Sequence, residues 1–420
     1  MSQKIQSITG MNDALPQDIF LWQQLEKKAR ALFENYGFAE IRTPILEETA
    51  LFSRGMGENT QVVQKEMYTF EDRGGDLVTM RPEGTAGVIR AYLQHSLNAQ
   101  EAVSKLYYMG PMFRYERPQK GRLRQFHQIG VETIGVDSPY ADAEAVIMLY
   151  RLTQNLGISH FRLEINSLGT AEERVPYIKE LVSFLNESAN LLCDECRDRI
   201  QKNPLRVLDC KKESCKKVTH HAPTILDSLG SQSRQDFEAF KTHLINAGIE
   251  FKVNPSLVRG LDYYEKTTFE FISDDLGSQS AFAGGGRYSK LAQELGAKTP
   301  IPSVGFSIGC ERMIMLMADL SIYKNHKPAL SGVYFVGMND NCFQECQKIM
   351  QRVRDTGIRA DMDYSAKSVK SQMRRANKFF FKYAAILGDS EIEKGVVAFK
   401  NLETGEQAEV FISDISAMVK

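Results

Sequence analysis

The sequence predicts an α+β protein with a sheet-based domain, a helical insertion within that domain and a small C-terminal α/β domain. Three observations lead to this prediction. Residues 103–135 have two strand-like segments on either side of a polar loop. Residues 171–248 shift to charged, helix-favouring sequence such as AEERVPYIKELVSFLNE. Beyond the polar stretch SIYKNHKPALSG, strand and helix patterns alternate, which is typical of an α/β domain.

Length and composition describe a folded chain. Its 420 residues predict about two to four domains, and 43% hydrophobic and 25% charged residues are near globular averages. The first residues, MSQKIQSITGMNDALPQD, lack a signal-peptide core, and no run of 18 apolar residues occurs, so we expect a cytoplasmic protein without a membrane partner. Seven cysteines fit reduced thiols better than a disulfide framework. With 52 basic and 53 acidic residues, any nucleic-acid site must be local.

The first predicted element is an amphipathic helix after Pro16, with Asp18 as a candidate N-cap and Gly37 as its end. Its apolar positions are Trp22, Leu25, Ala29, Leu32, Phe33 and Tyr36. The next stretch, FAEIRTPILEE, is predicted to be a strand interrupted by Pro44, which indicates a sheet edge or a subunit boundary because proline cannot donate a ladder hydrogen bond. RPEGTAGVIRAYL then indicates a turn leading into a helix.

The predicted hairpin at 103–135 has one polar face. Because side chains alternate along a strand, Phe126, Gln128, Gly130 and Glu132 share one face and His127, Ile129 and Val131 share the other. On the outgoing strand, Arg114 and Glu116 are also expected on a common face. The connecting loop holds four basic residues, which are Arg117, Lys120, Arg122 and Arg124. A basic loop above a polar floor suits phosphate groups.

The first sheet is expected to resume after the helical insertion. LVRGLDYYEKTTFEFIS has strand character, AFAGGGRYSKLAQEL indicates a glycine turn before a helix, and SVGFSIGCERMIMLMADL indicates a strand that runs into an apolar helix. The glycines at 284–286 are only a weak signal of a phosphate loop, since no GK[ST] follows them, and a plain tight turn is the alternative. In the C-terminal domain, GVYFVG, GIRADMD, YAAILG and GVVAFKN are the predicted strands, with helices near Cys342 and from Ser368 to Phe380.

A group of acidic and basic residues points to one chemistry. Carboxylates that recognise an ammonium or an imidazole N–H, next to arginines that hold a triphosphate, describe the activation of an amino acid by ATP. The candidate residues are Glu83, Arg114, Gln128, Glu132, Arg259 and Arg312. Taken singly, each could instead belong to a surface salt bridge.

Taken together, these segments resemble the histidyl-tRNA synthetase family, whose members are class II aminoacyl-tRNA synthetases. Residues 32–58 resemble motif 1, FRYERPQKGRLRQFHQIGVE resembles motif 2, and GFSIGCERM resembles motif 3. LVRGLDYY and AGGGRY resemble the two histidine-specific signatures. The resemblance covers nearly the whole chain and implies a catalytic core built on an antiparallel sheet with flanking helices.

The resemblance implies that the protein joins L-histidine to tRNA(His) through a histidyl-adenylate, with ATP as substrate and Mg²⁺ bridging its phosphates. Arg259 would be the catalytic arginine, and Arg114 would hold the α-phosphate and the substrate carboxylate. The other implied histidine-binding residues are Glu83, Thr85 and Gln128 for the ammonium and Glu132, Tyr263, Tyr264 and Tyr288 for the imidazole pocket. The implied ATP-binding residues also include Glu116, Arg122 at the γ-phosphate, and Phe126 and Arg312 around the adenine.

Two basic regions are implied to bind tRNA. The loop residues Arg117, Lys120 and Arg124 would meet its acceptor end or, alternatively, the outer phosphates of ATP. In the C-terminal domain, the resemblance implies an anticodon-binding role. No acid lies between residues 366 and 382, and helical spacing predicts a basic stripe of Lys367, Lys370, Arg374 and Lys378. A merely soluble helix face is the alternative for this stripe.

The insertion contains the pattern C-x2-C-x13-C-x4-C, formed by Cys193, Cys196, Cys210 and Cys215 and followed by His220 and His221. This spacing is near that of zinc ribbons, but its second pair is wider than the usual one. Four reduced thiols are therefore favoured over zinc, in a domain whose implied role is contact with the tRNA acceptor arm.

Domain boundaries follow from these patterns. We expect a catalytic domain at 1–170 and 249–322, the insertion at 171–248, a linker at 323–332 and the anticodon-binding domain at 333–420. Motif 1 implies a homodimer with Pro44 near the interface.

The main alternative function is that of the regulatory relative of this fold, which binds histidine as a phosphoribosyltransferase subunit. That relative typically lacks the anticodon domain and the arginine signature. A general nucleic-acid-binding protein leaves Glu83 and Glu132 without a purpose, and no HIGH or KMSKS motif indicates a class I synthetase.

Overall fold

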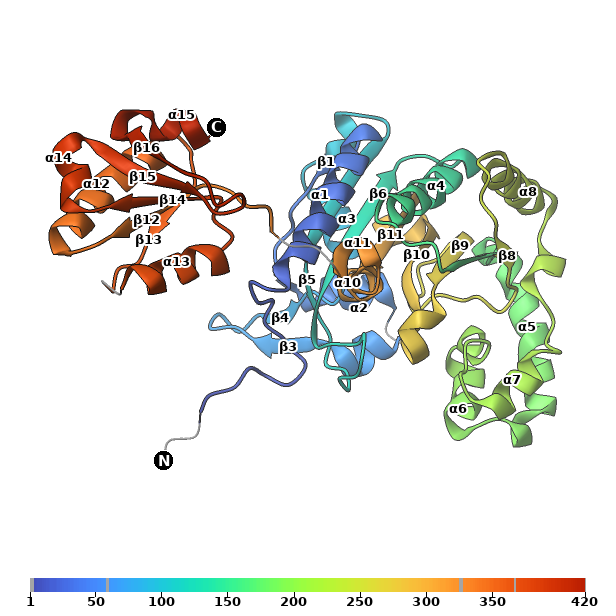
Figure 1. The fold of residues 1–420 in the computed structure, drawn as a ribbon. Coiled ribbons are helices and arrows are strands. Elements are labelled where there is room, and N and C mark those ends of the chain that lie inside the picture. Colours follow the sequence, from blue (N-terminus) through green and yellow to red (C-terminus); the bar gives the residue numbers. More distant parts are fainter. Residues whose placement is uncertain (1–3, 58–59, 325–327, 366–367, 420) are drawn as a thin grey trace. The chain divides into compact units, whose positions relative to one another are not determined.

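The computed structural model describes residues 4–57, 60–324, 328–365 and 368–419. The chain divides into two compact units, Met1–Lys324 and Asn325–Lys420 (Figure 1). Each unit combines helices with a mixed sheet, so the predicted α+β class is confirmed. Within the described part of the chain, no helix is both long enough and apolar enough to cross a membrane.

The first unit is built on an eight-stranded sheet with the order β1-β5-β6-β11-β10-β9-β7-β8. Its six central strands pair antiparallel, while the edge strands β1 and β8 pair parallel with their neighbours. The bounds are β1 Ala39–Glu40, β5 Ser104–Phe113, β6 Gln125–Ile134, β7 Arg162–Ser167, β8 Lys252–Val253, β9 Glu265–Ile272, β10 Ala281–Tyr288 and β11 Ser303–Gly309. The predicted hairpin is therefore β5 and β6, with Arg114 and Glu116 in the loop beyond β5 rather than on the strand.

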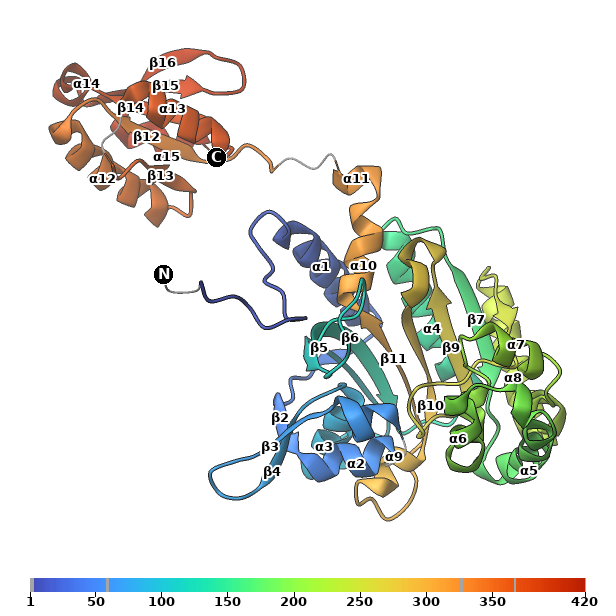
Figure 2. The ribbon, with the colours of Figure 1, turned by 90° about the horizontal axis from the view of Figure 1, so that it is seen from below.

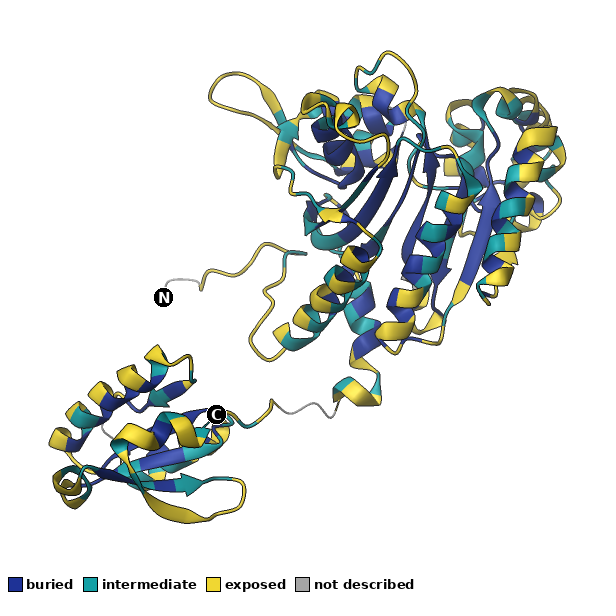
Figure 3. Cartoon of the chain, turned by 90° about the horizontal axis from the view of Figure 1, so that it is seen from above, coloured by how far each residue is buried: buried dark blue, intermediate teal, exposed yellow. Residues whose placement is uncertain are grey.

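Four helices pack on one face of this sheet, where the main core lies (Figures 1 and 2). They are α1 Ile19–Asn35, α4 Pro139–Asn155, α8 Ser231–Asn246 and α10 Cys310–Ala318. Alternate strand residues such as Ile129, Val131 and Phe306 enter this core, and the central strands are mostly buried while the helices keep exposed outer faces (Figure 3). Helix α8 falls inside the predicted insertion but packs on α4, and its Phe237 and Phe240 belong to the main core.

Local sequence explains two of the helix ends that flank the large sheet and the insertion. Helix α1 stops before Gly37, whose φ of +79° suits glycine. Asp18 precedes this helix but its side chain caps no backbone N–H, so the predicted N-cap is wrong in that respect. Helix α5, Ala171–Glu187, begins with a capping box in which the Thr170 hydroxyl and the Glu173 carboxylate each accept from the other residue's N–H.

Pro44 lies between β1, at the edge of the large sheet, and β2 of a three-stranded sheet, in agreement with the predicted interruption. That sheet has the order β2-β4-β3, with bounds Leu46–Glu48, Leu77–Met80 and Tyr68–Glu71. The neighbouring helical elements are α2 Thr49–Met56, η1 Val62–Glu66, α3 Thr85–Gln94 and η2 Leu97–Ala99. The predicted turn and helix in RPEGTAGVIRAYL thus correspond to the start of α3.

The insertion is helical, and its apolar side chains join those of α3, β5 and the 258–264 segment in a second core. Its elements before α8 are α5, η3 Ala189–Leu191, α6 Asp194–Lys202, η4 Pro204–Val207, α7 Glu213–Thr219 and η5 Ile225–Ser228. The remaining elements of the first unit are η6 Asp274–Gln279, α9 Lys290–Glu294 and α11 Ser321–Lys324. Helix α11 occupies the first part of the polar stretch at 321–332.

The glycine turn predicted in AFAGGGRY is absent, because Gly284, Gly285 and Gly286 lie within strand β10. A Cβ on Gly285 would come within 2.0 Å of the Gly305 carbonyl oxygen on β11, and one on Gly284 within 2.5 Å of Arg259 Nη1. Glycine is therefore required here for close approach rather than for chain reversal. The preceding strand β9 also begins only at Glu265, so LVRGLDYY is a loop rather than the predicted strand.

The second unit has a five-stranded sheet with the order β13-β12-β14-β15-β16. The strands are β12 Val333–Gly337, β13 Ala360–Met362, β14 Tyr383–Leu387, β15 Val396–Asn401 and β16 Gln407–Phe411. Helices α12 Asp340–Asp355, α14 Asp389–Lys394 and α15 Ile415–Val419, with η7 Ile412–Asp414, contribute to one core, and α13 Val369–Lys378 contributes to a separate one. The predicted alternation of strand and helix is present here.

Candidate active site

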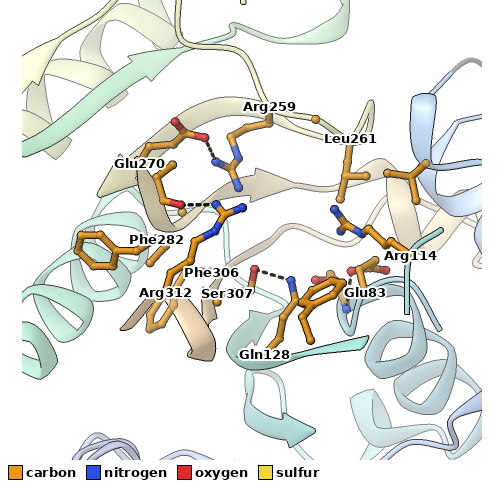
Figure 4. Close-up of a pocket in the computed structure, with 18 of the residues that line it drawn as sticks. Glu83, Arg114, Gln128, Arg259, Leu261, Glu270, Phe282, Phe306, Ser307 and Arg312 are labelled. Carbon is orange, nitrogen blue, oxygen red and sulfur yellow. Dashed lines mark hydrogen bonds and ion pairs between the residues drawn. The ribbon is translucent and has the colours of Figure 1, made fainter. Parts of the chain in front are cut away.

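A cavity of about 340 Å³ opens on the sheet face opposite the main helices (Figure 4). Its floor comes from β6, β9, β10 and β11, because residues such as Gln128, Glu132 and Ser307 alternate with the core residues of the same strands. The predicted site residues that line it are Glu83, Thr85, Arg114, Glu116, Arg122, Phe126, Gln128, Glu132, Arg259, Tyr263, Tyr264, Tyr288 and Arg312. The structure therefore brings together residues from positions 83 to 312.

Glu83 is held by the start of α3. Its two carboxylate oxygens accept hydrogen bonds from the backbone N–H groups of Thr85 at 2.7 Å and Ala86 at 2.8 Å. Burial raises the pKa of Glu83, and these hydrogen bonds oppose that rise. The carboxylate thus has a fixed position at the wall of the cavity.

Glu132 is buried on the floor, between two hydroxyl donors. Thr85 Oγ1 donates to Oε1 at 2.8 Å, and the Tyr288 hydroxyl donates to Oε2. Burial raises the pKa of Glu132 to about 8, which the two donors oppose and the negative charge of Glu83 reinforces. A cationic or N–H-bearing ligand would favour the ionised form of this side chain.

Gln128 lies beside these acids and keeps an acceptor available. Its Nε2 donates weakly to Ser307 Oγ at 3.5 Å, whereas its Oε1 is buried with no hydrogen-bond partner among the described residues (Figure 4). A buried, unpaired oxygen is costly without a ligand. Gln128 Oε1 therefore marks a position where an ammonium or N–H donor would bind.

Three arginines reach into the cavity from different elements (Figure 4). Arg259, in the LVRGLDYY loop, forms an ion pair with Glu270 of β9. Burial opposes the charge of Arg259, but Glu270 and the neighbouring tyrosines more than offset it, so the pKa of this guanidinium is raised. Arg259 is thus a permanently charged group that is held in place before any ligand binds.

Arg114 and Arg312 have different neighbours. Arg114 Nε donates to the Pro82 carbonyl at 2.9 Å, and its guanidinium lies 5.3 Å from the Phe126 ring centroid. Arg312 Nε donates to the Gly121 carbonyl at 2.7 Å, which ties helix α10 to the basic loop. Burial and the positive charge of Arg122 lower the pKa of Arg312. An anionic ligand beside this guanidinium would stabilise its positive charge. In this structure Phe126 lies against Arg114, so the adenine sandwich with Arg312 stays a prediction.

The basic loop divides into two parts. Arg122 lines the cavity and pairs with Glu116 at 2.6 Å. Arg117 and Lys120 are exposed, and Arg124 stacks 4.1 Å from the Tyr115 ring centroid, none of them among the lining residues. Only the Arg122 part of the loop is therefore placed for a ligand inside the cavity.

Several lining residues were not predicted from the sequence, notably Glu270, Glu311, Arg206 and Asp209. Glu270 alternates with the buried Phe269 and Phe271 on β9, so strand periodicity could have identified it. Arg206 and Asp209 belong to the insertion, and nothing local in the sequence indicates that this segment reaches the cavity.

Two predicted clusters lie outside the cavity. The exposed Lys370, Arg374 and Lys378 lie on α13, while Lys367 falls outside the described residues. The sulfur atoms of Cys193, Cys196, Cys210 and Cys215 all lie within 4.8 Å of one another. The spacing pattern of the sequence thus corresponds to a compact group in the structure.

Comparison with known proteins agrees with this arrangement. A family model described as "Histidyl-tRNA synthetase" matches residues 10–313, and one described as "Anticodon binding domain" matches residues 332–420. The histidine–tRNA ligase of Geobacter sulfurreducens is 47% identical over 406 residues, covering 97% of each chain, and that of Syntrophotalea carbinolica is 45% identical over 411 residues, covering 98% of this chain and 97% of the relative.

Solved structures also include histidyl-tRNA synthetases that resemble this chain. The apo histidyl-tRNA synthetase of S. aureus superposes with a TM-score of 0.81 at 33% identity, covering 99% of this chain and 100% of the other. A Bacillus halodurans protein described as an ATP phosphoribosyltransferase regulatory subunit/histidyl-tRNA synthetase has a TM-score of 0.64 at 18% identity, covering 92% and 99%, which reports on the fold alone. The antiparallel sheet with its charged cavity and the C-terminal α/β unit define a class II aminoacyl-tRNA synthetase. Within that class, the chain belongs to the histidyl-tRNA synthetase family.

Proposed function

We propose that this protein is a histidine–tRNA ligase that forms histidyl-adenylate from ATP and L-histidine and then transfers histidine to tRNA(His). The observation that supports this most directly is the position of Arg259, in the same cavity as Arg114 and the acidic pair Glu83 and Glu132. Positively charged side chains that suit a nucleotide and carboxylates that suit an amino acid thus line the same cavity. Family membership supports the same activity.

Histidine would bind at the acidic end of the cavity. Its ammonium would meet Glu83, the Thr85 hydroxyl and the free oxygen of Gln128, and the same hydroxyl holds Glu132 in place. The imidazole would lie among the remaining predicted residues, which are Glu132, Tyr263, Tyr264 and Tyr288. A side chain without hydrogen-bonding groups would leave these buried polar atoms unpaired, which can give discrimination of about 10⁴-fold.

ATP would bind at the arginine end. Arg114 would contact the α-phosphate and the histidine carboxylate, and Arg122, released from Glu116, would contact the γ-phosphate. Phe126 and Arg312 would lie on either side of the adenine. Mg²⁺ prefers oxygen ligands, and Glu116, Glu270 and Glu311 line the cavity. Since Glu270 and Glu311 already have protein partners, the ion would take most of its ligands from phosphates and water.

The chemistry would need positioning and charge rather than a covalent enzyme intermediate. A histidine carboxylate oxygen attacks the α-phosphorus, and the bond to the β-phosphate oxygen breaks to release pyrophosphate. Negative charge grows on the α-phosphate oxygens during this step. Arg259, held by Glu270, would stabilise that charge. The terminal ribose hydroxyl of tRNA then attacks the adenylate carbonyl carbon, and AMP leaves.

The tRNA would contact basic surfaces outside the cavity. Arg117, Lys120 and Arg124 would lie near its acceptor end, and the α13 stripe of Lys370, Arg374 and Lys378 near the anticodon arm. We also propose a cytoplasmic homodimer with Pro44 near its interface, and the four-part domain division given above. In that division the insertion at 171–248 includes α8, although this helix packs on the catalytic sheet.

Histidine-dependent exchange of pyrophosphate into ATP is the direct test of this function. We expect exchange with histidine, and charging of tRNA(His) when the tRNA is added. A chain that binds histidine but catalyses no exchange would instead match the regulatory relative of this fold. Both activities are measured with the full chain, so the result does not depend on the proposed domain boundaries.

A further inference from the structure

Four cysteines of the insertion converge from two helices and a loop. Cys193 immediately precedes α6, and Cys196 lies in the first turn of that helix. Cys210 lies between η4 and α7, and Cys215 lies in the first turn of α7. All four sulfur atoms lie within 4.8 Å of one another, which makes one compact group of four ligand atoms.

We propose that this group binds a single structural zinc ion. Zinc–thiolate bonds of about 2.3 Å in a tetrahedral site separate the sulfur atoms by about 3.8 Å. The 4.8 Å limit on every sulfur pair is compatible with that geometry after small side-chain rotations. An iron–sulfur cluster places several iron ions between its thiolates and needs a wider spacing. The four cysteines, and neither His220 nor His221, form the ligand set.

The surroundings suit a thiolate centre. Cys196 and Cys215 are fully buried, whereas Cys193 and Cys210 are partly exposed. The Cys193 backbone N–H already donates to Cys215 Sγ at 3.3 Å, an interaction that would stabilise the charge of a zinc-bound sulfur. Lysines 211, 212, 216 and 217 adjoin two of the ligands in sequence and would offset the negative charge of four thiolates.

A crosslink at the cluster would also stabilise two short helices. Helices α6 and α7 have only nine and seven residues, which is too short for stability in isolation. Each contributes few residues to the second core, and both begin at the cysteine cluster. A metal ion at this point would fix the two helix starts and the 203–210 loop to each other.

The zinc site would also support the catalytic loop. The segment before Cys210 contains Arg206, whose Nη1 donates to the Arg259 carbonyl at 3.0 Å. In the same segment, Asn203 Nδ2 donates to Asp262 Oδ1 at 2.9 Å. Arg206 is thus a positioning residue for the loop that presents Arg259. This second part of the inference rests on the proposed function, whereas the metal site does not.

Metal analysis tests the site directly. The full chain is produced with zinc in the medium, purified without chelators and analysed for metals by mass spectrometry. We expect about one zinc per chain, lost in Cys196→Ala and kept in Cys346→Ala. Both cysteines are fully buried, but Cys346 lies in the second unit, so it is a matched control. A wild-type chain that neither retains nor takes up zinc, or that holds iron instead, would overturn the proposal.

A spectroscopic measurement covers the case in which Cys196→Ala fails to fold. Wild-type protein in which zinc is replaced by cobalt should show the intense visible bands of tetrahedral thiolate coordination. Weak bands typical of oxygen or nitrogen ligands would contradict the four-cysteine site. This result needs no variant and no substrate.

Hydrogen exchange tests the link to the catalytic loop. Removal of the metal by a chelator should accelerate amide exchange in residues 203–210 and 257–264, and should lower the kcat of pyrophosphate exchange more than it raises the KM for histidine. Unchanged amide exchange at 257–264 would refute the link while leaving the metal analysis intact. Because amide exchange requires no turnover, it separates this failure from a failure of the proposed activity.

Discussion

The Tyr288 hydroxyl donates a hydrogen bond to Glu132 Oε2, although the two residues are 156 positions apart in the sequence. Tyr288 ends β10 and Glu132 lies on β6, and strand β11 separates them in the sheet. This contact fixes the orientation of the buried carboxylate that we assign to the imidazole of histidine.

Replacing the tyrosine tests the assigned specificity pocket. Tyr288→Phe removes one donor from Glu132 and leaves its pKa still higher, because that donor opposes the effect of burial. Loss of a hydrogen bond to a charged group costs about 2 kcal/mol. We therefore expect the KM for histidine to rise about 30-fold in pyrophosphate exchange, with the KM for ATP nearly unchanged. Tyr177→Phe is the control, since it removes a buried hydroxyl that bonds to Pro223 outside the cavity.

The raised pKa of Glu132 predicts a pH-dependent stability. Between the ordinary value of 4.5 and about 8, the unfolded chain has lost a proton that the folded chain keeps at Glu132. The free energy of unfolding should therefore fall as pH rises through this range. Glu132→Gln cannot titrate, so its thermal midpoint relative to the wild type should increase with pH. Parallel pH profiles for the two proteins would show that the pKa of Glu132 is not raised.

Removing the catalytic charge should affect the chemical step. Arg259→Ala is expected to slow pyrophosphate exchange by about 10²- to 10³-fold, the usual cost of removing one preorganised donor. Histidine affinity, measured by calorimetry, should be largely preserved. Arg162→Ala is the control, because Arg162 also forms ion pairs on this sheet but does not line the cavity. Normal turnover by Arg259→Ala would show that another group supplies the charge.

The basic stripe on α13 should act on tRNA alone. Replacement of Lys370, Arg374 and Lys378 by alanine is expected to raise the KM for tRNA(His) in the charging reaction and to reduce its salt dependence. Pyrophosphate exchange without tRNA should be unchanged. A control triple variant, Lys348→Ala, Arg352→Ala and Lys394→Ala, removes exposed basic residues from α12 and α14 of the same unit. Equal effects of the two triple variants would indicate a general charge effect rather than a binding stripe.

Local patterns predicted the elements well where a single periodicity governs them. The apolar face predicted for α1 and the alternation predicted for β6 are both found in the structure. The buried face of each element holds the residues that its periodicity predicted. The prediction of a glycine turn was wrong because the contacts that require glycine come from segments distant in the sequence. Gly284 lies against Arg259 of a distant loop, and Gly285 lies against Gly305 and Phe306 of β11, so no neighbour in sequence reveals those contacts.

Residue type and spacing along the chain were enough to predict the α+β class, the polar face of β6 and the family to which the chain belongs. The folded chain alone shows that Arg206 of the insertion donates to the Arg259 carbonyl, that Glu270 pairs with Arg259 and that four cysteine sulfurs lie together. Contacts of this kind depend on how distant segments pack. Packing brings side chains within bonding range without leaving a local pattern in either segment.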